Sequence, residues 1–165
     1  MIEVELVGVR VELPANQPIV LLKEKTGTRY LPIWIGAVEA TAIAFALQGV
    51  ETPRPLTHDL LVDVLEDLGI QLEAVHVTEL REGTFYAELQ LVQNGSRHTV
   101  SSRPSDAIAI ASRFESVPIF ASEDVMTEAG LEIEEAEEGT QVEAEEQVRQ
   151  FREFLEEVTP EDFRE

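Results

Sequence analysis

A seven-residue stretch, Pro53–Asp59, brings together a cation, a hydroxyl, an imidazole and a carboxylate just before an apolar helical pattern. Arg54 can bind a phosphate or a carboxylate through two parallel hydrogen bonds. His58 can act as a general base or a metal ligand, and Asp59 lies next to it in the sequence. Thr57 suits the N-cap of the following helix. Free backbone N–H groups at a helix start also favour an anion, so this stretch is our first candidate site.

A second stretch, Arg103–Asp106, repeats the arrangement before another apolar segment. It again joins an arginine to a proline, with Ser105 and Asp106 in what we expect to be the first helical turn. Proline fits the first helical position because its missing N–H would be unpaired there anyway. Arg103 and Arg54 could therefore bind phosphate, or they could form internal ion pairs with Glu39, Asp59 or Asp106.

Glu39 is the only charged residue between Leu31 and Val50, and the helix predicted around it is apolar on every face. A helix of this kind is buried in a domain or an interface, and a buried carboxylate is costly unless it is paired or bound to a cation. Glu39 is therefore either the partner of an arginine, or favourable simply at a helix N-terminus, or a metal ligand or general base.

Together these residues are candidates for a phosphate-binding site with acid–base or metal chemistry. Glu39, His58 and Asp59 are the candidate catalytic residues, and phosphate would be bound or positioned by Arg54, Thr57, Arg103 and Ser105. A metal would be held by Glu39, Asp59 and Asp106, and oxygen ligands favour Mg²⁺ or Mn²⁺. The sequence has no Gly-rich phosphate loop, so no organic cofactor is expected. Capping and internal pairing are the alternative explanation for each of these residues.

The elements that must position these groups alternate in blocks of strands and helices. Three strands precede two helices, three further strands follow, and a helix, a short strand and a last helical turn complete the pattern. This order predicts an α+β fold with a mixed, mostly antiparallel sheet packed with helices. Asn94-Gly95 predicts a hairpin, a phase slip at Gly8 predicts a bulge, and residues 117–120 predict a short edge strand.

The charge divides the chain into a globular part and an acidic end. Residues 1–131 hold 19 acidic and 9 basic residues, whereas residues 132–165 hold 14 and 3, so the net charges are −10 and −11. We expect a globular domain over 1–131, an acidic linker over 132–142 and an amphipathic C-terminal helix and tail over 143–165. The helix either docks on its own domain or binds a partner.

Composition restricts the classes of protein that the chain can belong to. The total charge of −21 argues against general attraction to nucleic acid or an anionic membrane, although a local cationic site is compatible with it. No apolar run is long enough for a membrane span. The chain has no cysteine, which excludes disulfides and thiolate metal sites. These features favour a cytoplasmic protein without a membrane partner.

Taken together, the motifs resemble those of the bifunctional nuclease (BFN) domain family. The resemblance covers about residues 3–130 and extends to the tail seen in bacterial members, with actinobacterial members the most similar. It rests on these strings, in this order: Leu31–Gly36 with Glu39-Ala40, Pro53–Asp59, Gly83–Ala87, Arg103–Ala107 and Pro118–Phe120.

The resemblance implies a BFN-like fold, homo-oligomers with a dimer favoured, and nuclease activity on DNA and RNA. Many members carry an Asp two residues before the Arg-Pro-Ser-Asp string, where this chain has Ser101. If that Asp were a metal ligand, this protein would lack it. Two functions are therefore compatible with the sequence: a metal-assisted nuclease, and a non-enzymatic oligomeric regulatory or anion-binding protein.

Overall fold

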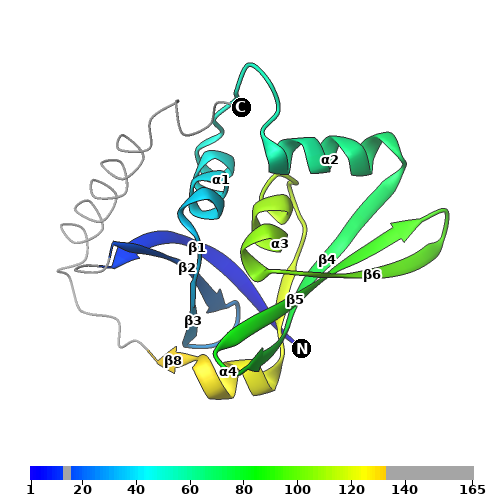
Figure 1. The fold of residues 1–165 in the computed structure, drawn as a ribbon. Helices are drawn as coiled ribbons and strands as arrows, with labels where there is room; N and C mark the ends of the chain where they lie inside the picture. Colours follow the sequence, from blue (N-terminus) through cyan, green and yellow to red (C-terminus); the bar gives the residue numbers. More distant parts are fainter. Residues whose placement is uncertain (13–15, 133–165) are drawn as a thin grey trace.

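The computed structural model describes residues 1–12 and 16–132 of the chain (Figure 1). The predicted C-terminal helix and tail over 143–165, and all of the acidic linker except its first residue, lie outside these ranges. The described part is an α+β structure in which four helices accompany one eight-stranded sheet. This confirms the predicted fold class.

The three strands predicted at the start of the chain form an antiparallel meander. These are β1 (Ile2–Glu12), β2 (Gln17–Glu24) and β3 (Arg29–Trp34). The register between β1 and β2 shifts between Leu6 and Gly8, which confirms the predicted bulge. The slip places apolar side chains from both halves of the long strand against the core.

The second group of strands is also antiparallel and is joined by two tight turns. Its members are β4 (Ile70–Arg81), β5 (Thr84–Gln93) and β6 (Ser96–Ser102). In the turn between β5 and β6, Asn94 has φ 50° and Gly95 has φ 78°. Two successive positive φ values match the right-handed twist of the strands, so the predicted Asn-Gly hairpin is confirmed.

The short strand β7 (Ile119–Ala121) joins the two groups in the middle of the sheet, whose order is β6-β5-β4-β7-β1-β2-β3-β8. It runs antiparallel to β1 and parallel to β4, so the prediction of an edge strand over 117–120 was wrong. Pro118 lies just before the paired residues, and its carbonyl oxygen accepts from the Val75 N–H at 3.0 Å. The proline therefore removes no donor from the ladder. The two-residue strand β8 (Leu131–Glu132) was not predicted.

The four helices are α1 (Ala37–Gln48), α2 (Thr57–Asp67), α3 (Pro104–Ala111) and α4 (Glu123–Ala129). Helix α1 ends at Gly49, whose φ of 65° is left-handed. In the described ranges, no helix has the length and apolar character that crossing a bilayer requires.

The start of α2 differs from the prediction by one residue. Leu56, not Thr57, is the N-cap, and its backbone N–H donates to Asp59 Oδ2 at 3.0 Å. The side chain of an acidic residue at the third helical position accepts from the N-cap N–H in this way in a capping box. Asp59 therefore fixes the helix start, and Thr57 lies in the first turn.

Helix α3 is the centre of the packing. All of its residues except Asp106 are buried, and it packs against α1, α2, β4 and β5. Figure 1 shows α1, α2 and α3 gathered at one end of the strands, with α4 at the other end. Strand β6 leads directly into α3. The last residues of β6 therefore lie next to the start of α3.

Replacing Ile108, which is fully buried in α3, tests this packing. We expect Ile108→Ala to lower the free energy of unfolding by about 2–5 kcal/mol, and Ile108→Val by about 0.5–1.5 kcal/mol, because of lost burial and the cavity left behind. Leu47→Ala, on an exposed position of α1, should change it by about 0.5 kcal/mol or less. Urea unfolding measures all three, and equal effects at positions 47 and 108 would contradict the packing.

Candidate functional site

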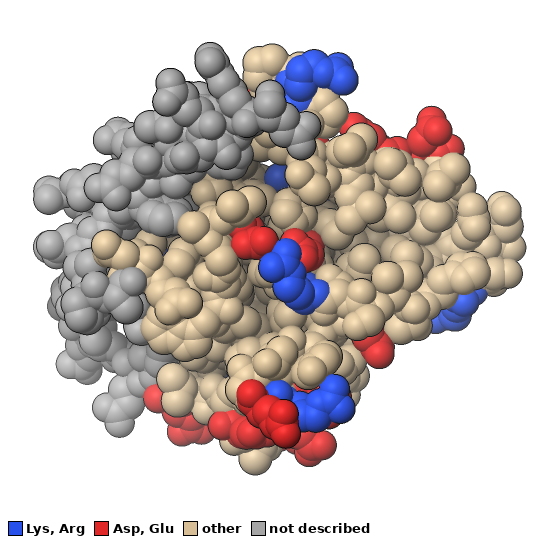
Figure 2. Space-filling view, in the orientation of Figure 1, with Lys and Arg blue, Asp and Glu red and all other residues tan. Residues whose placement is uncertain are grey.

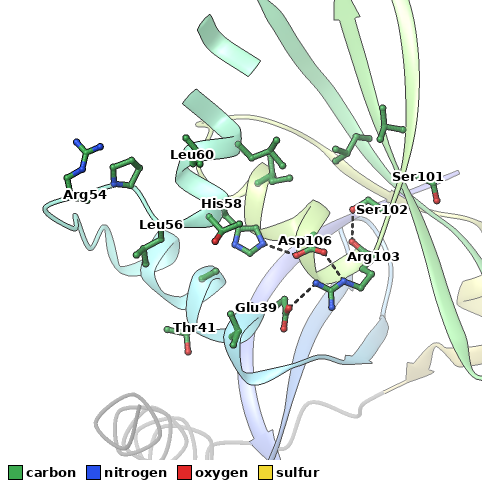
Figure 3. A pocket seen from close by; sticks show the side chains of 18 residues that line it. Glu39, Thr41, Arg54, Leu56, His58, Leu60, Ser101, Ser102, Arg103 and Asp106 are labelled. Carbon is green, nitrogen blue, oxygen red and sulfur yellow. Dashed lines mark hydrogen bonds and ion pairs between the residues drawn. The ribbon is translucent and has the colours of Figure 1, made fainter. Parts of the chain in front are cut away.

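A cavity of about 1250 Å³ opens where the starts of three helices meet the end of β6. Its wall includes residues from the first turns of α1, α2 and α3, together with the loop before α2. Each helix start carries unpaired N–H groups and a partial positive charge. Three such starts around one cavity favour an anion there. Figure 3 shows the polar side chains gathered between these elements.

His58 and Asp106 form the central polar pair of this cavity. The distance from His58 Nε2 to Asp106 Oδ1 is 2.8 Å, although the two residues are 48 apart in the sequence. The His58 side chain is only 11% exposed. Burial raises the pKa of Asp106, but hydrogen bonds from His58 and Arg103 outweigh it, so the pKa lies below its ordinary value of 3.8. Asp106 is therefore a carboxylate at neutral pH and accepts the proton of Nε2.

Arg103 bridges two carboxylates at the same place. Its Nε donates to Asp106 Oδ2 at 2.8 Å, and its Nη2 donates to Glu39 Oε1 at 2.9 Å. Glu39 is thus the partner of an arginine, one of the alternatives that the sequence left open. The Arg103 side chain remains 66% exposed, so it can still contact a ligand in the cavity.

Asp59 belongs to a separate ion pair behind the cavity. Arg113 Nε donates to Asp59 Oδ1 at 2.6 Å, and Arg113 Nη1 donates to the Ala109 carbonyl at 2.6 Å. Burial opposes ionisation of Asp59, but hydrogen bonds from Arg113 and the Leu56 N–H leave its pKa below 3.8. This pair ties the start of α2 to the end of α3 and so fixes the position of His58. Sequence reasoning missed Arg113 because its partner lies 54 residues away.

The remaining predicted site residues do not join the central cluster. Arg54 and Thr57 line the cavity and are exposed, and in Figure 3 the Arg54 guanidinium points away from His58. Ser105 is buried and does not line the cavity. Ser101 is exposed at its rim. The cluster therefore consists of His58, Asp106, Arg103 and Glu39.

The proposed metal ligands are not arranged around a common point. Arg103 lies between Glu39 and Asp106, and Asp59 faces Arg113. Within residues 1–12 and 16–132, no three His, Asp or Glu side chains are placed to hold a metal ion. The geometry of the described residues thus fits a guanidinium better than Mg²⁺ or Mn²⁺.

Uncharged surface surrounds the cluster. Figure 2 shows acidic and basic side chains together in the middle of this face, with the other charged groups scattered near its margin. Several rim residues are apolar and exposed, among them Leu60, Leu61 and Val100. Spacing alone does not distinguish a buried helix face from a cavity wall, so the sequence pattern did not show that Leu60 and Leu61 line a cavity.

Comparison with known proteins assigns the chain to a family. The family model described as Bifunctional nuclease domain matches residues 20–134, which include every residue of the cluster. The chain belongs to the bifunctional nuclease domain family. An uncharacterized protein of Mycobacterium tuberculosis is 53% identical to it over 98% of both chains.

The relatives of this chain include plant proteins that are named bifunctional nucleases. Bifunctional nuclease 2 of Arabidopsis thaliana is 30% identical over 72% of this chain, and Bifunctional nuclease 1 of Oryza sativa subsp. japonica is 29% identical over 72%. The matches cover 37% and 36% of those proteins. The chain therefore spans little more than a third of the length of these two plant relatives.

The Asp59–Arg113 pair predicts a specific pH dependence of stability. The folded-state pKa of Asp59 is lowered. The ionised carboxylate therefore adds to the free energy of unfolding above about pH 4, and this contribution is lost as the pH falls through the folded pKa. Asp59→Asn should lower the free energy of unfolding by about 1–2 kcal/mol at pH 7, a figure that allows for solvent screening. At pH 2.5 the difference between the variant and the wild type should be smaller than at pH 7, because protonation of Asp59 removes its negative charge from the pair.

Asp63→Asn is the matched control, since Asp63 is exposed on the same helix and no ion pair of it is found in the described part. Urea unfolding at both pH values provides the measurement. If Asp59→Asn lowered the free energy of unfolding by the same amount at both pH values, the ionic origin of the effect would be contradicted.

Proposed function

We propose that this family member hydrolyses phosphodiester bonds of nucleic acid, with His58 as its general base and Asp106 as the carboxylate that orients it. The observation that carries the proposal is the 2.8 Å contact between these side chains at the wall of a cavity that Arg103 also lines. A general base held by a carboxylate, beside a cation for developing negative charge, suits attack on phosphorus. Membership of the family supports the same reaction class.

The tautomer of His58 assigns the roles. Since Asp106 accepts the proton of Nε2, the lone pair of the neutral ring is on Nδ1. Nδ1 takes a proton from a water molecule as the water oxygen bonds to phosphorus and the ester P–O bond breaks. The leaving oxygen takes a proton from solvent, and the imidazolium returns its own to solvent. Asp106 stabilises the imidazolium in between.

Arg103 supplies the positive charge that the transition state requires. Its exposed guanidinium can donate to a non-bridging phosphate oxygen while Glu39 and Asp106 hold it in place. No step of this proposal passes through a metal ion, because Arg103 occupies the space between these two carboxylates.

His58→Asn should lower kcat for phosphodiester hydrolysis by about 10²–10⁴-fold, the usual contribution of a positioned acid–base group. His98→Asn should leave kcat unchanged, because His98 is exposed on β6 and does not line the cavity. Activity is measured on single-stranded DNA and RNA, each with EDTA and with added Mg²⁺.

We expect phosphodiester hydrolysis to proceed in EDTA and to depend on His58. Activity that survives His58→Asn would contradict the role of the histidine. Activity that disappears in EDTA and returns with Mg²⁺ would contradict the metal-free route and favour a rearrangement in which Arg103 leaves Glu39 and Asp106.

A second candidate function is a non-enzymatic oligomeric regulator that binds an anion. The exposed apolar side chains of α2 and of its C-cap favour it, because patches of this kind mark protein interfaces. They are Leu60, Leu61 and Val64 in the helix and Leu68 at the C-cap. Binding of a phosphodiester without hydrolysis, under all the conditions above, would select this candidate.

Either function is compatible with a homo-dimer, and we propose that Val64 and Leu68 lie in its interface. Leu68→Lys should then shift the sedimentation-equilibrium mass toward that of a monomer, because an interfacial charge would be desolvated. Leu47→Lys, at an equally exposed position of α1, should leave the mass unchanged. A wild-type protein that is monomeric at all concentrations would contradict the dimer.

A further inference from the structure

The charge of the cavity is small and balanced. Its charged lining residues are Arg54 and Arg103, which are cationic, and Glu39 and Asp106, which are anionic. Arg103 is already paired with both acids, and Arg54 stands apart from them (Figure 3). The site therefore has cationic groups for one phosphate, or two at most.

On the face that Figure 2 shows, the described residues beyond the cavity form no basic track for a long strand. Residues 1–131 carry ten more acidic than basic side chains, and the whole chain carries −21. Figure 2 shows no stripe of basic side chains leading away from the central cluster. A protein that binds a polynucleotide neutralises several phosphates along its backbone, which this face cannot do.

The apolar rim is built for a flat, uncharged group. Leu60, Leu61 and Val100 are 53%, 40% and 45% exposed and line the cavity beside the polar cluster. Solvent-exposed aliphatic groups on a cavity wall gain free energy when a ligand covers them. A nucleobase is flat and weakly hydrated on its faces, so it can cover these side chains while its phosphate reaches Arg103.

We propose that the cavity binds a phosphodiester of one or two nucleotides, with a base against Leu60, Leu61 and Val100 and the phosphate at Arg103. Its volume of about 1250 Å³ slightly exceeds the range of about 300–1,000 Å³ typical for drug-sized ligands. A dinucleotide fits this size without contacts outside the cavity. The inference deepens the proposed function by naming its substrate class, but binding can be tested without hydrolysis.

The first test compares lengths of the same ligand. A thymidine dinucleotide and a thymidine strand of roughly twenty nucleotides, both with hydrolysis-resistant phosphorothioate linkages, are titrated calorimetrically at about 50 and 200 mM salt. We expect the affinity of the dinucleotide to be within about threefold of the affinity of the strand, counted per occupied site. With at most two phosphates neutralised, its affinity should fall by about sevenfold or less between these salt concentrations.

The second test addresses the apolar rim. Leu60→Ala and Val100→Ala should each weaken dinucleotide binding several-fold, because each removes part of the wall that the base covers. The same variants should leave the binding of dimethyl phosphate, which has no base, unchanged. Leu47→Ala is the matched control, since Leu47 is similarly exposed but lies outside the cavity lining.

Three results would overturn the inference: no dinucleotide binding at millimolar concentration, a strand that binds more than about tenfold tighter per site, or a strand whose affinity falls more than about fiftyfold between the two salt concentrations. Equal effects of Leu60→Ala and Leu47→Ala would overturn the assignment of the rim. These outcomes are independent of catalysis. A protein that binds the dinucleotide as described but cleaves no phosphodiester refutes the proposed function and leaves the binding inference standing.

Discussion

The bridge that Arg103 forms between Glu39 and Asp106 is the interaction on which the arrangement of the site depends. It neutralises two carboxylates that would otherwise be costly at the edge of an apolar core. It also joins the start of α1 to the start of α3. Without this bridge, Asp106 would lose one of the two hydrogen bonds that hold it beside His58, and the orientation of the imidazole would no longer be fixed.

The topology of the sheet brings these distant segments together. Because β7 lies between β4 and β1, both strand groups belong to one sheet, and α3 packs against its second group while α1 packs against its first. The Asp59–Arg113 pair then attaches the start of α2 to the end of α3. Three helix N-termini thus surround one cavity, and their partial positive charges favour the anion that Arg103 would bind.

Local signals predicted most of the elements, whereas long-range pairing was beyond them. Gly8 predicted the bulge, and Asn94 with Gly95 predicted the hairpin, because each of these two features depends on the backbone conformation of one or two residues. The central place of β7 depends on partners far away in the sequence, so a three-residue strand after Pro118 looked like an edge. Glu39 and His58 were recognisable as unusual from their neighbours, but nothing local showed that an arginine would separate the carboxylates.

The state of the His58 ring tests the central claim most directly, and the chain has only three histidines, so their signals can be assigned. Nitrogen-15 NMR of the free protein should show His58 as the tautomer protonated at Nε2. Adding a phosphorothioate dinucleotide should shift the His58 signals and leave those of His76 and His98 in place. Protonation at Nδ1 alone, or a His58 signal that does not respond to the ligand, would contradict the account.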